Sequence, residues 1–156
     1  MLYEILSTLL EWLAENVFTF KPITSVTVPE LFSLYFTYFA VALLVAFPFM
    51  LIDKRRREPP TLGEIIIGSV LEELFFRGLP LHLFGSNGAV YGTIIWSLLH
   101  YHHLGSIAFA MVFGILLARL WIGGLWLEAV FLHMFHGTLC LAVGKYLKER
   151  RTFLTR

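Results

Sequence analysis

Residues 31–52 read LFSLYFTYFAVALLVAFPFMLI, an apolar segment of 22 residues without a charged side chain. A helix of this length, rising about 1.5 Å per residue, covers the roughly 30 Å of hydrocarbon in a bilayer. The segment therefore predicts a transmembrane helix. The composition agrees, because 58% of the 156 residues are hydrophobic and only 15% are charged, which is too little polar surface to coat a soluble globule. We expect membrane lipid to surround the protein.

Basic residues follow this segment directly. The sequence DKRRREPP at 53–60 holds four consecutive basic residues, Lys54 to Arg57, and then two prolines that stop a helix. A second basic cluster occupies the C-terminal tail, residues 146–156. Four predicted crossings separate the clusters, so both lie on one side, which the positive-inside rule identifies as the cytoplasm. The net charge is only +1, so the grouping indicates membrane topology, and we expect no nucleic-acid partner.

Apolar segments separated by turn signals continue through the rest of the chain. Thr61 and Glu64 have the spacing of a capping box, which predicts the start of the next helix. Turns at FGSNG, HHLG and WIGG then divide residues 61–145 into a core of four predicted helices, which are Leu62–Leu83, Ala89–His102, Ser106–Leu120 and Leu125–Lys145.

The N-terminal segment, residues 1–30, fits two descriptions. Three glutamates, Glu4, Glu11 and Glu15, interrupt its apolar residues. It forms either an amphipathic helix in the membrane interface or a first membrane helix. The linkers are too short to separate a second domain. We therefore predict an all-α fold, a single multi-pass membrane domain over residues 1–156 that forms a transmembrane bundle of about five to six helices.

Three ionisable residues lie inside the first core helix. The sequence LEELFFRG at 71–78 places Glu72, Glu73 and Arg77 in apolar surroundings, where a charge costs at least about 2.5–3.5 kcal/mol to insert. Glu73 and Arg77 share a helix face and can form a charge-assisted pair. Glu72 projects about 100° away from Glu73, which leaves it free for another partner. The alternative is a purely structural salt bridge with one protonated glutamate.

Histidines add polar groups to two neighbouring helices. His100 ends the helix that contains WSLLH, and His133 and His136 lie in the last helix. Because a buried imidazole needs polar company in lipid, we expect these side chains to gather near Glu72. A carboxylate and a neutral imidazole can share a water, one taking its proton while the other polarises it. This pairing can hydrolyse an amide without a covalent nucleophile.

Two alternatives to metal-free hydrolysis stay open. Glu72, His100 and His133 match a two-histidine, one-carboxylate zinc set whose fourth position holds a water. Zinc is the one cofactor that the sequence suggests, although the HExxH spacing is absent and Cys140 is the only cysteine. The third hypothesis is a non-catalytic membrane adaptor or small transporter, whose polar cluster is structural or binds protons.

The order of these motifs resembles the intramembrane CAAX-protease and bacteriocin-processing family. That family has a double glutamate with an arginine, then an aromatic residue and a histidine four apart, then a histidine and an asparagine four apart. Here EELFFRG, WSLLH and GGLWLEAVFLHMFHG follow in the same order between residues 61 and 143. The resemblance implies that Glu72 and His100 activate a water and that His133 helps to stabilise the oxyanion. It also implies a membrane-associated peptide or protein substrate, prenylated proteins among them.

The chain departs from the family pattern at two positions. Trp96 stands where phenylalanine is usual, and Gly137 stands where the asparagine is expected. Glycine has no side chain, so His136 is the candidate substitute donor. Losing one oxyanion donor typically lowers turnover by about 10²–10³, so either His136 or a backbone amide replaces the donor, or the activity is low.

Our leading hypothesis is an intramembrane endopeptidase. In this hypothesis Glu72 is the general base, His100 shares the water, His133 faces the oxyanion, and Arg77 holds Glu73 in place. A test of the glutamate is direct, because Glu72→Gln removes the base and keeps the shape.

The depths of these residues in the bilayer need one further assumption. Glu72 and His133 fall roughly 15 Å from the nearer ends of their helices, whereas His100 lies near the end of its own. The adjacent His102 and His103 are expected to be solvated. We therefore predict a recessed, water-filled cavity that opens to the cytoplasm and brings the three depths together.

Overall fold

The computed structural model describes residues 2–50, 60–100 and 104–154, and the side chains of residues 3–49, 60–100 and 104–146. Within these ranges the chain forms helices and no strand, so the predicted all-α class is confirmed. The basic loop Lys54–Arg57, His102 and His103 lie outside the described residues, as do most side chains of the basic tail.

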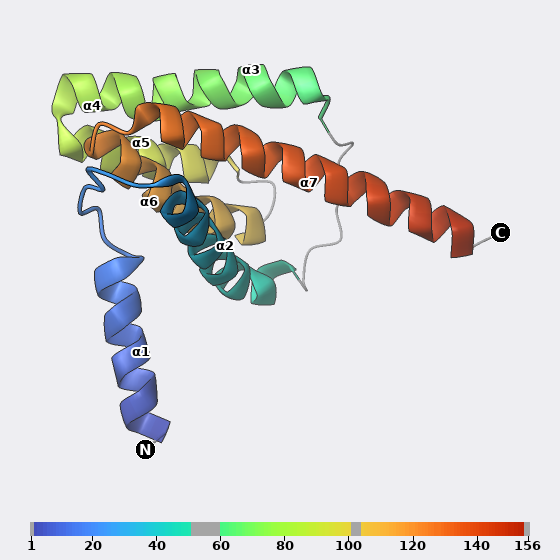
Figure 1. Ribbon diagram of the computed structural model, residues 1–156, viewed down its shortest axis with the longest axis horizontal. Helices are drawn as coiled ribbons and strands as arrows, with labels where there is room; N and C mark the ends of the chain where they lie inside the picture. The colour runs from blue at the N-terminus through green and yellow to red at the C-terminus, as the bar shows by residue number, and fades with distance from the viewer. Residues whose placement is uncertain (1, 51–59, 101–103, 155–156) are drawn as a thin grey trace.

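Eight helical elements follow one another in the described chain (Figure 1). They are α1 (Leu2–Asn16), α2 (Val28–Met50), α3 (Leu62–Glu73), the π-helical segment η1 (Leu74–Gly78), α4 (Leu79–Phe84), α5 (Ser86–Leu99), α6 (Leu104–Ile122) and α7 (Trp126–Leu154). By length and composition, three stretches can cross a membrane, which are Val28–Phe49, Leu104–Ile122 and Trp126–Tyr146. The helical membrane bundle predicted from the sequence is confirmed.

Helix α6 lies at the centre of the bundle. It packs against α2, α5 and α7, and its Phe113, Leu116, Leu117 and Leu120 are almost completely buried. The run of α3, η1 and α4 lies beside α7, and the two run in opposite directions (Figure 1). On the outside, large apolar side chains are exposed on every helix of the bundle, as expected for a surface that faces lipid.

The second predicted helix begins where the sequence indicated. Thr61 accepts a hydrogen bond from the Glu64 backbone, and the Glu64 side chain accepts one from the Thr61 backbone, so the predicted capping box is present. The helix continues through η1 and α4 to Phe84, one residue beyond the predicted end. The π-helical turn in its middle was not predicted.

Proline explains part of this π-helical turn. Pro80 has no backbone N–H, so it cannot donate to the carbonyl of Phe76 four residues earlier. The widened turn places that carbonyl against α5, where a Cβ on Gly92 would lie only 1.7 Å from the Phe76 oxygen. One turn earlier, a Cβ on Gly88 would lie 1.9 Å from the Pro80 oxygen. The two glycines therefore let α5 pack directly on the backbone of η1 and α4.

Two predicted boundaries were wrong. Helix α5 starts at Ser86 instead of Ala89, because Gly85 alone makes the turn with φ at +62°, a conformation that favours glycine. Helix α7 extends to Leu154 instead of ending near Lys145, since the tail contains good helix formers and no glycine or proline breaks it.

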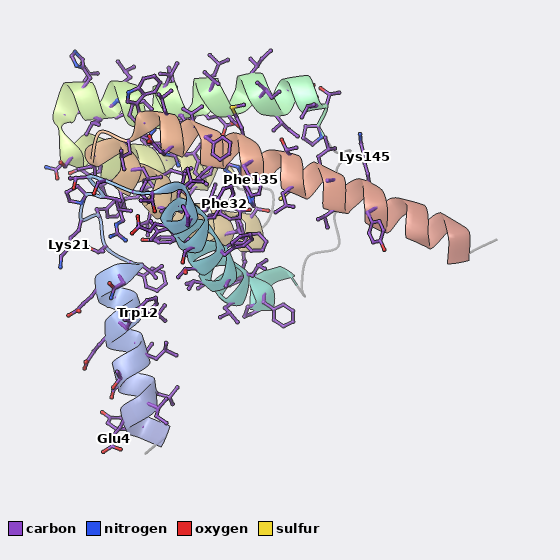
Figure 2. The ribbon with its side chains drawn as sticks, in the orientation of Figure 1. Glu4, Trp12, Lys21, Phe32, Phe135 and Lys145 are labelled. Carbon is purple, nitrogen blue, oxygen red and sulfur yellow. The ribbon has the colours of Figure 1, made fainter. Side chains whose placement is uncertain are left out.

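Helix α1 stands away from the bundle, with Glu4 near its free end and Trp12 further along (Figure 2). The loop after it is held by Arg119 of α6, which donates to the backbone oxygens of Asn16 and Lys21. With 15 residues, α1 is not one of the three candidate spans. Its location, in the interface or across the bilayer, stays a prediction.

Candidate active site

Glu73 is fully buried and accepts three hydrogen bonds. The donors are Arg77 Nη1, His133 Nδ1 and Trp121 Nε1, each at 2.8 Å from a carboxylate oxygen. The Glu73–Arg77 pair expected from their spacing is therefore present in the structure. These donors come from η1, α6 and α7, so Glu73 ties three segments of the bundle together.

Arg77 is also completely buried and lies against an aromatic ring. Its guanidinium carbon is 4.2 Å from the centroid of the Trp96 ring, a cation–π distance. Within the described chain, Nε and Nη2 of Arg77 have no hydrogen-bond partner. The ring of Trp96 therefore provides much of the stabilisation on that side of the cation.

Glu72 belongs to a different environment from that of its neighbour. Its side chain is 41% exposed, and its Oε2 accepts a hydrogen bond of 2.6 Å from Trp96 Nε1. The same oxygen lies 3.7 Å from His133 Nε2. The two adjacent glutamates thus divide as predicted, since Glu73 pairs with Arg77 and Glu72 is left for other partners.

His133 lies between the two glutamates. Its Nδ1 contacts Glu73 at 2.8 Å, whereas its Nε2 faces Glu72 at 3.7 Å. An ionised carboxylate only accepts, so Nδ1 carries a proton. The distance to Glu72 exceeds that of a direct hydrogen bond. Glu73 therefore fixes the orientation of the imidazole and leaves Nε2 facing Glu72.

His100 forms the C-terminal cap of α5 and has its own orienting hydrogen bond. Its Nδ1 is 2.9 Å from the backbone oxygen of Trp96. A carbonyl oxygen only accepts, so Nδ1 is the protonated atom and Nε2 of the neutral ring holds a lone pair. The ring packs edge-on against Trp96, as does the ring of His133. Trp96 therefore contacts both histidines as well as Glu72.

A cavity of about 320 Å³ lies next to these residues. Its polar wall contains His100, His133 and His136, and the rest is mainly aromatic and aliphatic. Glu72 does not line the cavity, but it contacts His133 and Trp96, which do. The three histidines therefore share this cavity, whereas the predicted meeting of Glu72, His100 and His133 around one water stays a prediction, as does the side of the membrane to which the cavity opens.

His136 lies on the cavity wall between two polar partners. Its Nδ1 is 3.1 Å from the Tyr35 hydroxyl and its Nε2 is 3.5 Å from Cys140 Sγ. Gly137, at the position of the family's asparagine, faces another way, because a Cβ there would lie 2.6 Å from Cγ2 of Ile65 on α3. The substitution of asparagine by glycine therefore coincides with close packing of α7 on α3.

The zinc hypothesis requires a cluster of ligands around one point. Among the described residues, no group of three or more His, Cys, Asp or Glu side chains is arranged to hold a metal ion. Glu72, His100 and His133 in particular do not form such a group. The described side chains therefore do not fit a zinc site in this arrangement.

Three residues that contact the site were not identified as site residues from the sequence. Trp96 and Trp121 each donate an indole N–H to one glutamate, and Tyr35 contacts His136 from α2. Trp96 had a usable signal, because it stands four residues before His100 in WSLLH. Trp121 and Tyr35 had none, since both contacts depend on how distant helices pack.

Comparison with known proteins is informative at the level of the family. The family model Rce1-like, described as Type II CAAX prenyl endopeptidase Rce1-like, matches residues 59–139. Neither the curated proteins nor the solved structures include a match. The matched region covers more than half of the 156 residues and contains both glutamates and all three histidines of the site. The chain therefore belongs to the Rce1-like family of type II CAAX prenyl endopeptidases, a family of membrane proteases.

Proposed function

We propose that the protein hydrolyses a peptide bond of a membrane-associated peptide or prenylated protein, using a water activated by Glu72. One observation carries the proposal. Glu72 and Glu73 lie on either side of His133, next to a cavity that His100 also lines. Carboxylate, imidazole and an open space for substrate are thus adjacent, as general acid–base hydrolysis requires.

The charges of the cluster support this role for Glu72. Two ionised glutamates and Arg77 leave one negative charge when His133 is neutral, and a second proton on His133 balances it. An unbalanced charge is costly in a medium of low dielectric constant. Glu72 Oε2 and His133 Nε2 lie 3.7 Å apart, so the carboxylate proposed to take a proton and the imidazole proposed to donate one are neighbours, as general acid–base hydrolysis requires.

The reaction then follows from the orientation of each group. Glu72 takes a proton from water while the water oxygen bonds to the substrate carbonyl carbon, and His100 Nε2 accepts a hydrogen bond from the second hydrogen of that water, which stays on the new carboxyl group. The protonated Nε2 of His133 donates to the oxyanion. Glu72 finally returns its proton to the amine nitrogen as the carbon–nitrogen bond breaks. Glu73 and Arg77 keep His133 in place through this cycle.

The apolar wall of the cavity bears on the substrate class. Phe39, Leu43, Phe109 and Phe113 line it beside the histidines, so it accommodates an apolar chain next to a reacting carbonyl. The family is described by its action on prenylated CAAX proteins, which makes a farnesylated CAAX tail the first substrate to test. We further propose that both basic clusters lie in the cytoplasm, where such tails are found.

A pair of Glu→Gln variants tests the proposal. The assay follows a farnesylated CAAX peptide with a fluorophore and a quencher on either side of the scissile bond, using full-length protein in detergent. Glu72→Gln should lower turnover by about 10²–10⁴, the range for losing a general base. Glu64→Gln is the matched control, because this glutamate of the same helix is exposed and its role is the helix cap.

Two outcomes would contradict the proposal. Cleavage by Glu72→Gln at the wild-type rate would exclude Glu72 as the base. Loss of cleavage in the presence of a strong chelator, restored by adding zinc, would favour the metal-dependent reaction over a metal-free one. A matched peptide without the farnesyl group separates recognition of the lipid from recognition of the peptide.

A further inference from the structure

Tyr35 is a buried residue of α2 whose hydroxyl group reaches the cavity wall. The side chain is 0% exposed, and its hydroxyl lies 3.1 Å from His136 Nδ1, 101 positions further along the sequence. Its ring also packs against Phe39, Phe113 and Phe135. Helix α2 precedes the region matched by the family model, so this contact is an addition to the matched motifs.

Burial determines the direction of this hydrogen bond. A buried hydroxyl hydrogen without an acceptor costs about 1–3 kcal/mol. Among the described residues, His136 is the acceptor within reach of the Tyr35 hydroxyl. If the phenol donates, Nδ1 must accept, and a neutral imidazole then carries its proton on Nε2. The contact therefore selects one of the two tautomers of His136.

The Nε2–H of that tautomer faces a weak partner. It lies 3.5 Å from Cys140 Sγ, and a thiol sulfur is a poor acceptor. Both side chains line the cavity. A carbonyl oxygen that enters the cavity is a better acceptor than the sulfur, so the donor can change partners at little cost.

Aromatic neighbours hold the imidazole ring in place. Phe109 stacks on it at 5.0 Å with an interplanar angle of 20°, and Phe113 lies 4.7 Å away. His133 is three residues earlier on the same helix and lines the same cavity. The two histidines thus present their rings to one space, and His136 is held by the stacked ring of Phe109, by the tilted ring of Phe113 and by the contact at Nδ1.

We infer that Tyr35 is a positioning residue of the active site, which holds His136 as a neutral Nε2–H donor for the carbonyl oxygen of the substrate. The inference rests on the proposed function and deepens it, because it supplies a replacement for the donor that Gly137 cannot provide. Before the substrate enters, the Nε2–H group of His136 contacts Cys140 Sγ.

The tautomer can be measured without a substrate. In full-length protein labelled with ¹⁵N-histidine and reconstituted in nanodiscs, the two ring nitrogens of a neutral histidine have well-separated chemical shifts. The chain has six histidines, so the signals of His136 are assigned by their loss in His136→Ala. We expect wild-type His136 to be protonated on Nε2. Protonation on Nδ1 would overturn the inference, even if Tyr35→Phe failed to fold.

Turnover of the farnesylated CAAX peptide tests the role of the contact. Tyr35→Phe should lower kcat about tenfold, the effect of about 1.4 kcal/mol, with little change in KM. His136→Ala should lower it by about 10²–10³, as for one oxyanion donor. Because Tyr35 acts through His136, the double variant should be no slower than His136→Ala alone. Additive losses, or an unchanged kcat in Tyr35→Phe, would overturn the inference.

Tyr38→Phe is the matched control. Tyr38 lies three residues further along α2 and is also buried, but its hydroxyl donates to the backbone oxygens of Asn16 and Val17. The Tyr38→Phe variant should leave the ¹⁵N signals of His136 unchanged. Any decrease in kcat that it causes should add to the decrease caused by His136→Ala in the double variant. Failure of the proposed function would be a separate result. It would appear as cleavage of the peptide by the Glu72→Gln variant, whereas the tautomer of His136 is measured without a substrate and does not depend on that outcome.

Discussion

Replacing Trp96 by phenylalanine removes one N–H from the site and keeps an aromatic ring. The indole donates to Glu72 Oε2 at 2.6 Å. Phenylalanine is the usual residue at this position in the family that the sequence resembles. We expect Trp96→Phe to lower kcat for the farnesylated CAAX peptide while the fold persists. The physical reason is that the carboxylate proposed as general base loses the indole donor that holds it in position.

The size of the effect follows from the hydrogen bond and the exposure of its acceptor. A hydrogen bond to a charged group contributes about 1.5–3 kcal/mol. At about 1.36 kcal/mol per factor of ten, the rate would fall by at most about 10–150-fold if the whole interaction served to position the carboxylate in the transition state. The Glu72 side chain is 41% exposed, so water replaces part of the lost interaction. We therefore expect the lower end, about tenfold, and a loss of stability below about 1 kcal/mol.

Trp121→Phe is the matched comparison, because it makes the same chemical change at the other glutamate. Trp121 donates to Glu73 Oε2 at 2.8 Å, but Glu73 is 0% exposed and water cannot replace the donor. The variant should lose about 1–3 kcal/mol of stability, measured by thermal unfolding in detergent. Trp96→Phe should therefore affect turnover more, and Trp121→Phe should affect the unfolding temperature more.

The comparison can fail in two ways. Full activity of Trp96→Phe would show that the indole N–H does not assist Glu72. An equal drop in unfolding temperature for both variants would show that exposure of the carboxylate does not decide whether water replaces the donor. In either case the assignment of separate roles to the two glutamates would have to be abandoned.

Two further predictions concern glycines at helix contacts and are read by thermal unfolding. Gly92→Ala should destabilise the protein by about 2 kcal/mol or more, since the new Cβ would lie 1.7 Å from the Phe76 oxygen; Gly68→Ala, which has open space, should be neutral or stabilising. Gly137→Asn should also destabilise, and Ile65→Ala should recover part of the loss, because it removes the Cγ2 that lies 2.6 Å from the new Cβ. Purely additive losses at positions 65 and 137 would contradict this packing.

The sequence was sufficient to predict those features of the structure that depend on residues close together in the chain. The capping box at Thr61 and Glu64 predicted the start of α3, and the four-residue spacing of Glu73 and Arg77 predicted their pair. Both depend on residues within one helical turn, so the chain itself brings them together. The helix ends at Gly85 and Gly124 were also indicated, because a positive φ favours glycine.

Long-range packing set the features that were missed. The π-helical turn in η1 combines a local cause, Pro80, with a distant one, the glycines of α5 that approach its carbonyls. From the sequence, Trp96 was identified only as the aromatic residue of the WSLLH motif, and Trp121 only as part of the turn WIGG. Neither description predicts which glutamate receives the N–H, because that depends on how α5 and α6 lie against α3.

The position of α2 has a consequence for how the catalytic region is delimited. The family model matches residues 59–139, yet α2 packs along α6 and supplies Tyr35 to His136. Without α2, the aromatic cage around His136 would lose Phe39, and buried residues of α6 such as Phe113 would lose a covering helix. In lipid this exposure costs little hydrophobic free energy, because hydrocarbon replaces protein contacts. Removal of α2 would instead change the orientation of the His136 imidazole, since lipid offers no hydroxyl to replace that of Tyr35. The matched region therefore contains the groups that we propose to react, whereas the orientation of His136 depends on a helix that lies outside that region.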